Sequence, residues 1–240
     1  MARVLTAAVF VPSPPLLVPE LNGLAAGETD ELRGAALAAA SEIADCTHWV
    51  VVGTGPTAGR VASTAIGTFR GYGADVRVDL GPDATGDPDP DLPLSALIAG
   101  WLRDHAAPTV RAEVHIVPID AGRDECTRLG QRLRAGLDDA DTPRGLLVIA
   151  DGAATLTAKA PGAFDARAEA VETDLTAALG AGDPGALTAL DPDRCAELLL
   201  DGRAAWQVLA GVFGAAPSAV KIAYSGAPYG VGYHVGIWRP

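Results

Sequence analysis

Few side chains in this sequence are suited to acid–base or nucleophilic chemistry, and the strongest candidates lie in its second half. Asp151 follows the apolar run 145–150, where a carboxylate at a strand end can act as a general base or simply cap the next turn. Thr155 lies in the same polar stretch, and His234 follows the glycine-rich segment 230–233. We take Asp151, Thr155 and His234 as the candidate catalytic residues.

The other potential metal ligands fit structural positions better. His48 begins a predicted strand, His105 ends a predicted helix, and His115 lies within another strand. The three cysteines are Cys46, Cys126 and Cys195. Their odd number and wide spacing predict buried thiols, and neither a disulfide framework nor a zinc site. We therefore predict no metal site from the spacing of these residues.

Two common motifs are missing or incomplete. No Gly-x-Ser-x-Gly turn occurs, and neither Ser13 nor Ser225 has an obvious histidine base in the sequence. Residues 53–58 match the Gly-x-Gly-x-x-Ala pattern of dinucleotide-binding turns. However, Pro56 removes one of the backbone N–H groups that such a turn offers to a pyrophosphate. The pattern therefore favours a plain tight turn over a dinucleotide site.

Composition excludes several classes of protein. Of the 240 residues, 49% are hydrophobic and 20% charged, which is typical of a folded domain with a sizeable core. The net charge of −12 argues against a nucleic-acid partner, which needs a basic surface. No apolar run reaches the roughly 18 residues of a membrane-spanning helix. Arg3 and residues 4–11 resemble a short signal peptide, but Pro12 ends the stretch, so we predict a strand and a cytoplasmic protein.

Strands alternate with helices, which predicts an α/β fold: one three-layer α/β/α domain over residues 1–240 with a central mixed sheet. The predicted strands are 4–11, 48–52, 74–80, 113–119, 145–150, 219–224 and 231–238. The predicted helices are 29–45, 94–104 and 123–137, followed by a mostly helical region up to residue 214. Ligands of open α/β sheets bind beyond the carboxyl ends of strands. This rule points to the loops 12–20, 53–59 and 150–162.

Segments at these three loops carry a family resemblance. They are 11–20 (Val-Pro-Ser-Pro-Pro-Leu-Leu-Val-Pro-Glu), 49–56 (Trp-Val-Val-Val-Gly-Thr-Gly-Pro) and 148–155 (Val-Ile-Ala-Asp-Gly-Ala-Ala-Thr), with the ending 229–233. In order and spacing they resemble the family of class III extradiol ring-cleavage dioxygenase catalytic chains, which includes the Memo-type proteins. The first segment is similar to that family's P-H-P-P-L-L-x-P-E motif, and the third to its S-G-D-L-S-H motif.

The resemblance implies a domain like the catalytic chain of the extradiol dioxygenases, a homodimer, and Fe(II) held by two histidines and a carboxylate. In this chain the two histidine positions fall at Ser13 and at or near Gly55, and the acid–base position falls at Thr155. No Asp or Glu follows Asp201 to supply the late carboxylate ligand. Hydroxyls are poor ligands for Fe(II), and glycine has no side chain. The sequence therefore predicts a divergent member without the family's iron site.

Three functions remain open. The main prediction is a fold that has lost iron and kept its pocket, acting without a cofactor as a small-molecule-binding or regulatory protein. One alternative is a metal-free acid–base enzyme in the same cleft. The other is an Fe(II) dioxygenase with relocated ligands, which would bring His234 near His48 or His115. Whether the chain is an enzyme is left open. The expected pocket residues are Ser13, Thr54, Gly55, Lys159 and Tyr229.

Overall fold

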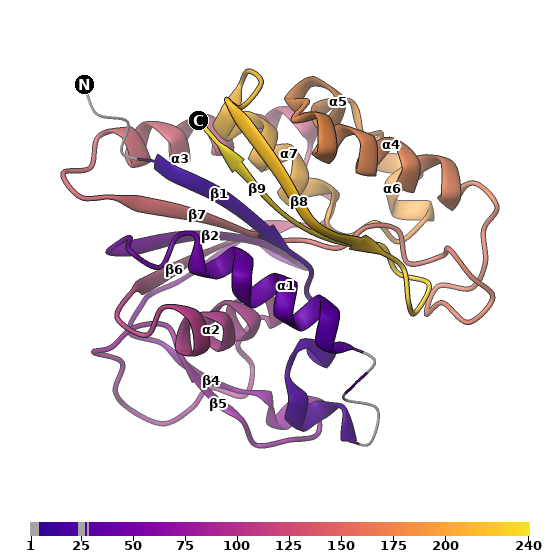
Figure 1. Cartoon of the computed structure of the whole chain (residues 1–240). Helices are drawn as coiled ribbons and strands as arrows, with labels where there is room; N and C mark the ends of the chain where they lie inside the picture. The colour runs from indigo at the N-terminus through magenta and orange to yellow at the C-terminus, as the bar shows by residue number, and fades with distance from the viewer. Residues whose placement is uncertain (1–4, 24–26, 28) are drawn as a thin grey trace.

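Figure 1 shows a central sheet between two layers of helices in the computed structural model, which describes residues 5–23, 27 and 29–240. The strands of this sheet are β1 (Leu5–Val11), β2 (His48–Gly55), β3 (Gly59–Val61), β6 (Arg111–Pro118), β7 (Arg144–Ile149), β8 (Ala219–Gly226) and β9 (Tyr233–Arg239). Their order is β3-β6-β2-β7-β1-β9-β8. The four strands β6, β2, β7 and β1 are parallel, whereas β3 and the β8–β9 hairpin add antiparallel pairs. The predicted α/β fold with a mixed central sheet is confirmed.

Helices cover both faces of the sheet (Figure 1). One face carries α1 (Asp30–Ser41) and α2 (Leu94–Ala106). The other carries α3 (Arg123–Asp138), α4 (Ala168–Ala181), α5 (Pro184–Ala189), α6 (Pro192–Glu197) and α7 (Arg203–Phe213). The short helices α5 and α6 each begin with proline behind an aspartate whose carboxylate caps the first turn. Within the described residues, no helix has the length and apolar character needed to cross a membrane.

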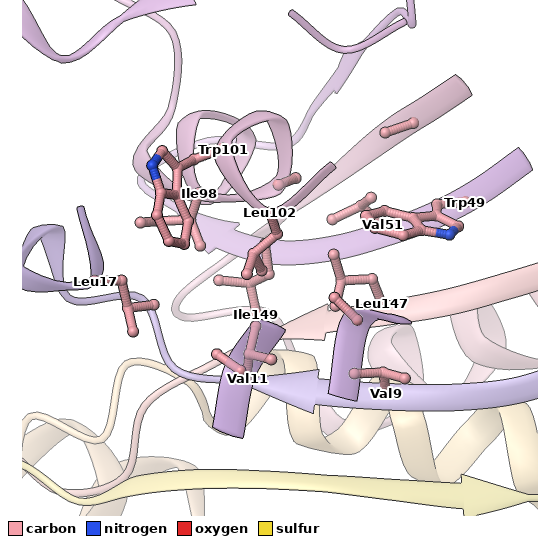
Figure 2. Close-up of a cluster of buried hydrophobic side chains, with 14 of the residues drawn as sticks. Val9, Val11, Leu17, Trp49, Val51, Ile98, Trp101, Leu102, Leu147 and Ile149 are labelled. Carbon is pink, nitrogen blue, oxygen red and sulfur yellow. The ribbon is translucent and has the colours of Figure 1, made fainter. Parts of the chain in front are cut away.

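Alternate residues of the central strands form two separate hydrophobic layers, because successive side chains of a strand point to opposite faces. Toward α1 and α2 lie Val9 and Val11 of β1 and Leu147 and Ile149 of β7, all at most 1% exposed. Figure 2 shows them gathered with Trp101 of α2. Burying each such aliphatic side chain is worth about 1.5–3 kcal/mol, so this layer anchors the carboxyl ends of β1 and β7.

The opposite layer is built around aromatic rings. The ring of Phe10 meets Trp206 of α7 edge-on at 5.6 Å between centroids, and Trp238 of β9 at 6.4 Å. Here α3 and α7 approach each other so closely at Gly130 that a Cβ at this position would overlap the carbonyl oxygen of Val208. This contact packs α3 and α7 against each other over the sheet.

The predicted elements differ from the structure in three places. The predicted strand 74–80 is only β5 (Arg77–Asp79), which pairs with β4 (Ile66–Thr68) in a separate two-stranded sheet. Neither β3 nor β4 was predicted, because a strand of three residues is too short to show alternation. The tight turn predicted at 53–58 is wrong in part: Gly53 and Gly55 lie inside β2, paired with β6.

Other local predictions also have a clear outcome. The predicted first strand starts at Leu5 in the structure, and Arg3 and Val4 lie outside the described residues. All three cysteines are buried and unpaired, as their spacing predicted.

Candidate functional site

A cavity of about 460 Å³ lies where three parallel strands end. Its wall includes Ser13 just beyond β1, Thr54 near the end of β2, and Asp151 just beyond β7. Because β1, β7 and β2 are parallel neighbours, their carboxyl ends share one edge of the sheet. This is the edge at which open α/β sheets bind their ligands.

Asp151 is the central polar group of this cavity. Its Oδ1 accepts a hydrogen bond from the backbone N–H of Ser13 at 2.7 Å, and its Oδ2 accepts one from the Ser13 hydroxyl at 2.5 Å. Burial raises the pKa of the Asp151 carboxyl to about 6, although the two bonds from Ser13 act in the opposite direction. The nearby charge of Asp201 adds to the rise, and that of His234 opposes it. The carboxyl therefore changes its charge close to neutral pH.

The proline-rich loop after β1 places Ser13 against this carboxylate. Residues 12, 14 and 15 are prolines and have no backbone N–H, so Ser13 is the single main-chain donor in the segment 12–15. The N–H of Leu17 donates to the carbonyl of Pro14 at 3.0 Å and closes a 3₁₀ turn. The fully buried side chain of Leu17 anchors this turn in the core. The loop is therefore a stiff segment that presents one donor pair to Asp151.

The backbone of Asp151 is fixed from the side of α7. The indole Nε1 of Trp206 donates to the Asp151 carbonyl at 3.2 Å. Gly202, which precedes α7, lies so close that an added Cβ would overlap the same carbonyl oxygen. Asp151 is thus held at its side chain by the β1 loop and at its main chain by α7.

The rest of the cavity wall is acidic, aromatic and apolar. Asp201 lies at the rim, and burial raises the pKa of its carboxyl. Tyr229 and Tyr233 also line the cavity, and burial, with the charge of Asp151 as a second cause, raises the pKa of the Tyr233 phenol. No Lys, Arg or His side chain lines this cavity in the part of the chain that the structure describes. Two carboxyls in a wall without a basic lining residue give the cavity a negative potential.

Ser95, near the start of α2, adds a polar atom with no partner. Its hydroxyl oxygen is buried in the cavity wall and has no hydrogen-bond partner within the described residues. The Ser95 side chain packs directly against the backbone of Gly53, so a Cβ at residue 53 would overlap it. Buried hydroxyls are usually hydrogen-bonded, so the unpartnered Ser95 hydroxyl is an exception among the described residues. The glycine that resembled a dinucleotide motif thus has a packing role.

The other predicted site residues are divided between the cavity and its surroundings. Thr54 and Tyr229 line the cavity. Thr155 is 2% exposed, and its hydroxyl donates to the carbonyl of Leu198 at 3.3 Å, away from the cavity. Lys159 is exposed on the loop after β7 and does not line the cavity.

His234 belongs to a second cavity, of about 570 Å³. Its Nε2 lies 2.7 Å from Oε1 of Glu172, and its Nδ1 lies 3.1 Å from the hydroxyl oxygen of Ser225. The structure therefore does not bring His234 into hydrogen-bonding contact with Asp151 or Thr155. Sequence reasoning missed Glu172, because it lies 62 residues before His234 inside a helical region and no motif connects the two. It also assigned Ser225 no histidine base, whereas β8 and β9 pair Ser225 directly with His234.

The positions that the family uses for iron do not fit the metal in this chain. The hydroxyl of Ser13 donates to Asp151, and that of Thr155 donates to the backbone. Gly55 lies against Ile116, whose Cγ2 would be 2.8 Å from an added Cβ. Among the described residues, no group of three or more His, Cys, Asp or Glu side chains is arranged to hold a metal ion. A site of two imidazoles and one carboxylate cannot be assembled from these groups.

Comparison with known proteins supports the architecture alone. No known protein family matches the sequence, and no curated protein is similar to it. The fold is similar to a solved structure, the crystal structure of uncharacterized protein JW3007 from Escherichia coli K12. The TM-score is 0.60 at 12% sequence identity, and the match covers 98% of this chain and 100% of that one. Fold and site together define a mixed α/β protein with an acidic cavity at the carboxyl ends of its parallel strands.

Proposed function

We propose that this chain is a divergent, iron-free relative of the extradiol dioxygenases that binds a small organic cation, such as a protonated amine, in the Asp151 cavity. The observation that carries the proposal is the acidic wall: Asp151 held by Ser13, Asp201 at the rim, and no basic side chain among the described lining residues. A bound ammonium group favours the ionised form of Asp151 and donates charge-assisted hydrogen bonds to it. Burial raises the pKa of the Asp151 carboxyl, and a positive charge bound beside it would lower that pKa.

The remaining wall suggests the rest of the ligand. Tyr229 and Tyr233 offer aromatic faces, which attract cations and stack on rings. The cavity of about 460 Å³ falls in the usual range for small-molecule sites, roughly 300–1,000 Å³. A ligand with one ring and one ammonium group matches these features.

Isothermal titration calorimetry with three probes of similar size tests the proposal. Phenethylamine is cationic, phenethyl alcohol is neutral and hydrocinnamate is anionic. We expect the amine to bind at least tenfold more tightly than the alcohol, about 1.4 kcal/mol, and the anion not to bind. Asp151→Asn is expected to abolish the preference for the amine, because it removes the buried negative charge.

Asp87→Asn is the matched control, since Asp87 is exposed in a loop outside the cavity. It makes the same change in net charge and is expected to leave amine binding unchanged. Equal binding of the three probes, or an Asp151→Asn protein that still prefers the amine, contradicts the proposal.

A second candidate function is acid–base catalysis by Asp151 in the same cavity. The observation that favours it is the pKa of about 6, which suits a general base at neutral pH. The two functions differ in what happens to the bound molecule. Incubation of a bound amine with the protein, followed by proton NMR, is expected to recover the amine unchanged. Conversion that disappears in Asp151→Asn would favour the enzyme.

The iron-dependent alternative is tested by metal content. The protein is reconstituted with Fe(II) without oxygen and desalted, and its iron and catechol turnover are measured on the same sample. We expect no stoichiometric iron and no ring cleavage, because His234 lines one cavity while His48 and His115 line another. Stoichiometric iron together with ring cleavage would overturn the iron-free proposal.

A further inference from the structure

Three side chains from three elements form a hydrogen-bonded chain beside the second cavity. Ser225 on β8 and His234 on β9 are direct cross-strand partners, so their side chains project from the same face of the hairpin. The Ser225 hydroxyl oxygen lies 3.1 Å from Nδ1 of His234, and Nε2 of that ring lies 2.7 Å from Oε1 of Glu172 on α4. A hydroxyl, an imidazole and a carboxylate in this order are the groups that activate a serine nucleophile.

The bonding pattern places the protons. A carboxylate can only accept, so Nε2 of His234 donates to Glu172. In the neutral ring Nδ1 then carries a lone pair, which accepts the proton of the Ser225 hydroxyl. The imidazole is 2% exposed, whereas Ser225 is exposed. The base is therefore shielded and held in one tautomer, while the hydroxyl beside it is open to a substrate.

Glu172 is itself firmly positioned. Its Oε2 accepts a hydrogen bond from the backbone N–H of Ala153 at 2.9 Å. Residues 152 and 232 are both glycine, and an added Cβ at either would overlap the Glu172 carboxylate. The same two glycines join their loops through a 2.7 Å bond from the N–H of Gly152 to the carbonyl of Gly232. Two loops far apart in sequence are thus shaped around this one carboxylate.

The second cavity sets the class of substrate. Its volume is about 570 Å³, and its wall includes Leu156, Ala177 and Ala227 together with Ser225 and His234. No Lys or Arg lines it in the described part of the chain, whereas two glutamates do. An anionic acyl group would be repelled there, and a short uncharged acyl group would not.

We propose that Ser225 is the nucleophile of a second site that cleaves small uncharged esters, with His234 as its base and Glu172 as a positioning residue. Oγ of Ser225 forms a bond to the acyl carbon while its proton passes to Nδ1 of His234. The ester C–O bond breaks, and the leaving alkoxide takes this proton. Water then attacks the acyl-serine, gives one proton through His234 back to Ser225, and releases the acid. The site is separate from the Asp151 cavity and independent of the function proposed for it.

Covalent labelling with an uncharged alkyl fluorophosphonate tests the proposal directly. The probe is expected to add once per chain, with loss of fluoride, and peptide mass spectrometry is expected to find it on Ser225. Ser225→Ala should abolish the adduct, and the protein should still fold because Ser225 is exposed on an edge strand. Ser218→Ala is the matched control: the Ser218 hydroxyl donates to the carbonyls of Arg239 and Pro240, and its loss should not affect labelling. No adduct, or an adduct that persists in Ser225→Ala, overturns the proposal.

The role of Glu172 is tested by Glu172→Gln. Glutamine still offers an oxygen to the N–H of Ala153, but it no longer enforces the tautomer in which Nδ1 of His234 is the acceptor. We expect the labelling rate to fall at least about a hundredfold, the usual contribution of a positioned base, while the melting temperature stays close to that of the wild type. A structural role alone would lower the melting temperature and leave the labelling rate of the folded protein unchanged, which would contradict the assignment of Glu172.

Discussion

At the residue scale, the two hydrogen bonds from Ser13 do not compensate Asp151 for its burial. Both bonds lower the pKa of the carboxyl, yet the net result is a rise from 3.8 to about 6. Desolvation therefore outweighs two charge-assisted bonds. The ionised form of Asp151 is destabilised in the folded protein, and any ligand that brings a positive charge relieves this cost.

The raised pKa of Asp151 predicts a stability that falls as the pH increases. Between pH 4 and 6 the folded chain holds a proton that the unfolded chain releases, so unfolding becomes easier as the pH rises through this window. The shift from 3.8 to about 6 corresponds to a loss of up to about 3 kcal/mol at neutral pH. Asp151→Asn removes this loss. In urea unfolding, we expect the stability of the variant relative to the wild type to rise by about this amount from pH 4 to pH 7.5.

The same experiment on Asp87→Asn serves as the control, and its difference from the wild type should change much less with pH. A constant difference between Asp151→Asn and the wild type at both pH values would contradict the raised pKa.

Several cavity residues could be predicted from the sequence, because they follow apolar strands in a fold whose sites lie at strand ends. Ser13, Thr54 and Asp151 all belong to this set. Ser95 and Asp201 could not be found in this way, because each comes from a helix or loop brought to the cavity only by tertiary packing. Thr155 and His234 lie close to strand ends, but the chain turns their side chains away from the Asp151 cavity.

At the element scale, the contact between α3 and α7 depends on the absence of side chains. A Cβ on Gly130 would overlap the carbonyl of Val208 and lie 2.7 Å from Cα of Gly211. Gly136 lies six residues later on the same helix and has no neighbour within 4 Å of an added Cβ. Both glycines therefore lie in the same helix, but only Gly130 is in close contact with a neighbouring helix.

Alanine at Gly130 and alanine at Gly136 are expected to change the stability of the fold in opposite directions. Gly130→Ala is expected to destabilise the fold by roughly 1–3 kcal/mol, because α3 and α7 must separate. Gly136→Ala is expected to stabilise it by about 0.5–1 kcal/mol, because alanine loses less backbone entropy in a helix. Chemical denaturation of the two variants and the wild type measures both effects. Destabilisation by both substitutions to the same extent would show that Gly130 is not a packing contact.

The long elements were predictable because they show clear patterns. Strand β7 is an apolar run, and the strands β1 and β2 were located to within a few residues for the same reason. The pairing of the loop after β7 with the β8–β9 turn was not predictable, since it depends on backbone bonds such as that from the N–H of Leu156 to the carbonyl of Gly230. A second such bond, from the N–H of Gly152 to the carbonyl of Gly232, joins the two glycines that lie against Glu172.

At the scale of the whole molecule, the two hydrophobic layers share one sheet. Leu146 and Leu147 are neighbours on β7, both fully buried, and they point to opposite layers. The prediction of a single domain requires that the two layers unfold together. The homodimer implied by the family resemblance stays a prediction, and β8 forms one outer edge of the sheet in the isolated chain.

Leu146→Ala and Leu147→Ala form a matched pair for the single-domain prediction. Each is expected to cost about 2–5 kcal/mol, because each leaves a cavity in a close-packed layer. Thermal unfolding followed by far-UV circular dichroism and by tryptophan fluorescence should give one coincident transition, shifted in both variants. Two steps, of which only one moves in each variant, would contradict a single cooperative domain.

Carboxyl carbon-13 NMR directly measures whether Asp151 has a raised pKa and binds a cation. The Asp151 signal, assigned by its loss in Asp151→Asn, is followed over pH with and without phenethylamine. We expect a pKa of about 6 without the amine and a clearly lower one with it, since the cation binds the ionised form. An Asp151 pKa near its ordinary value, or one that the amine leaves unchanged, would show that Asp151 is not the cation-binding group.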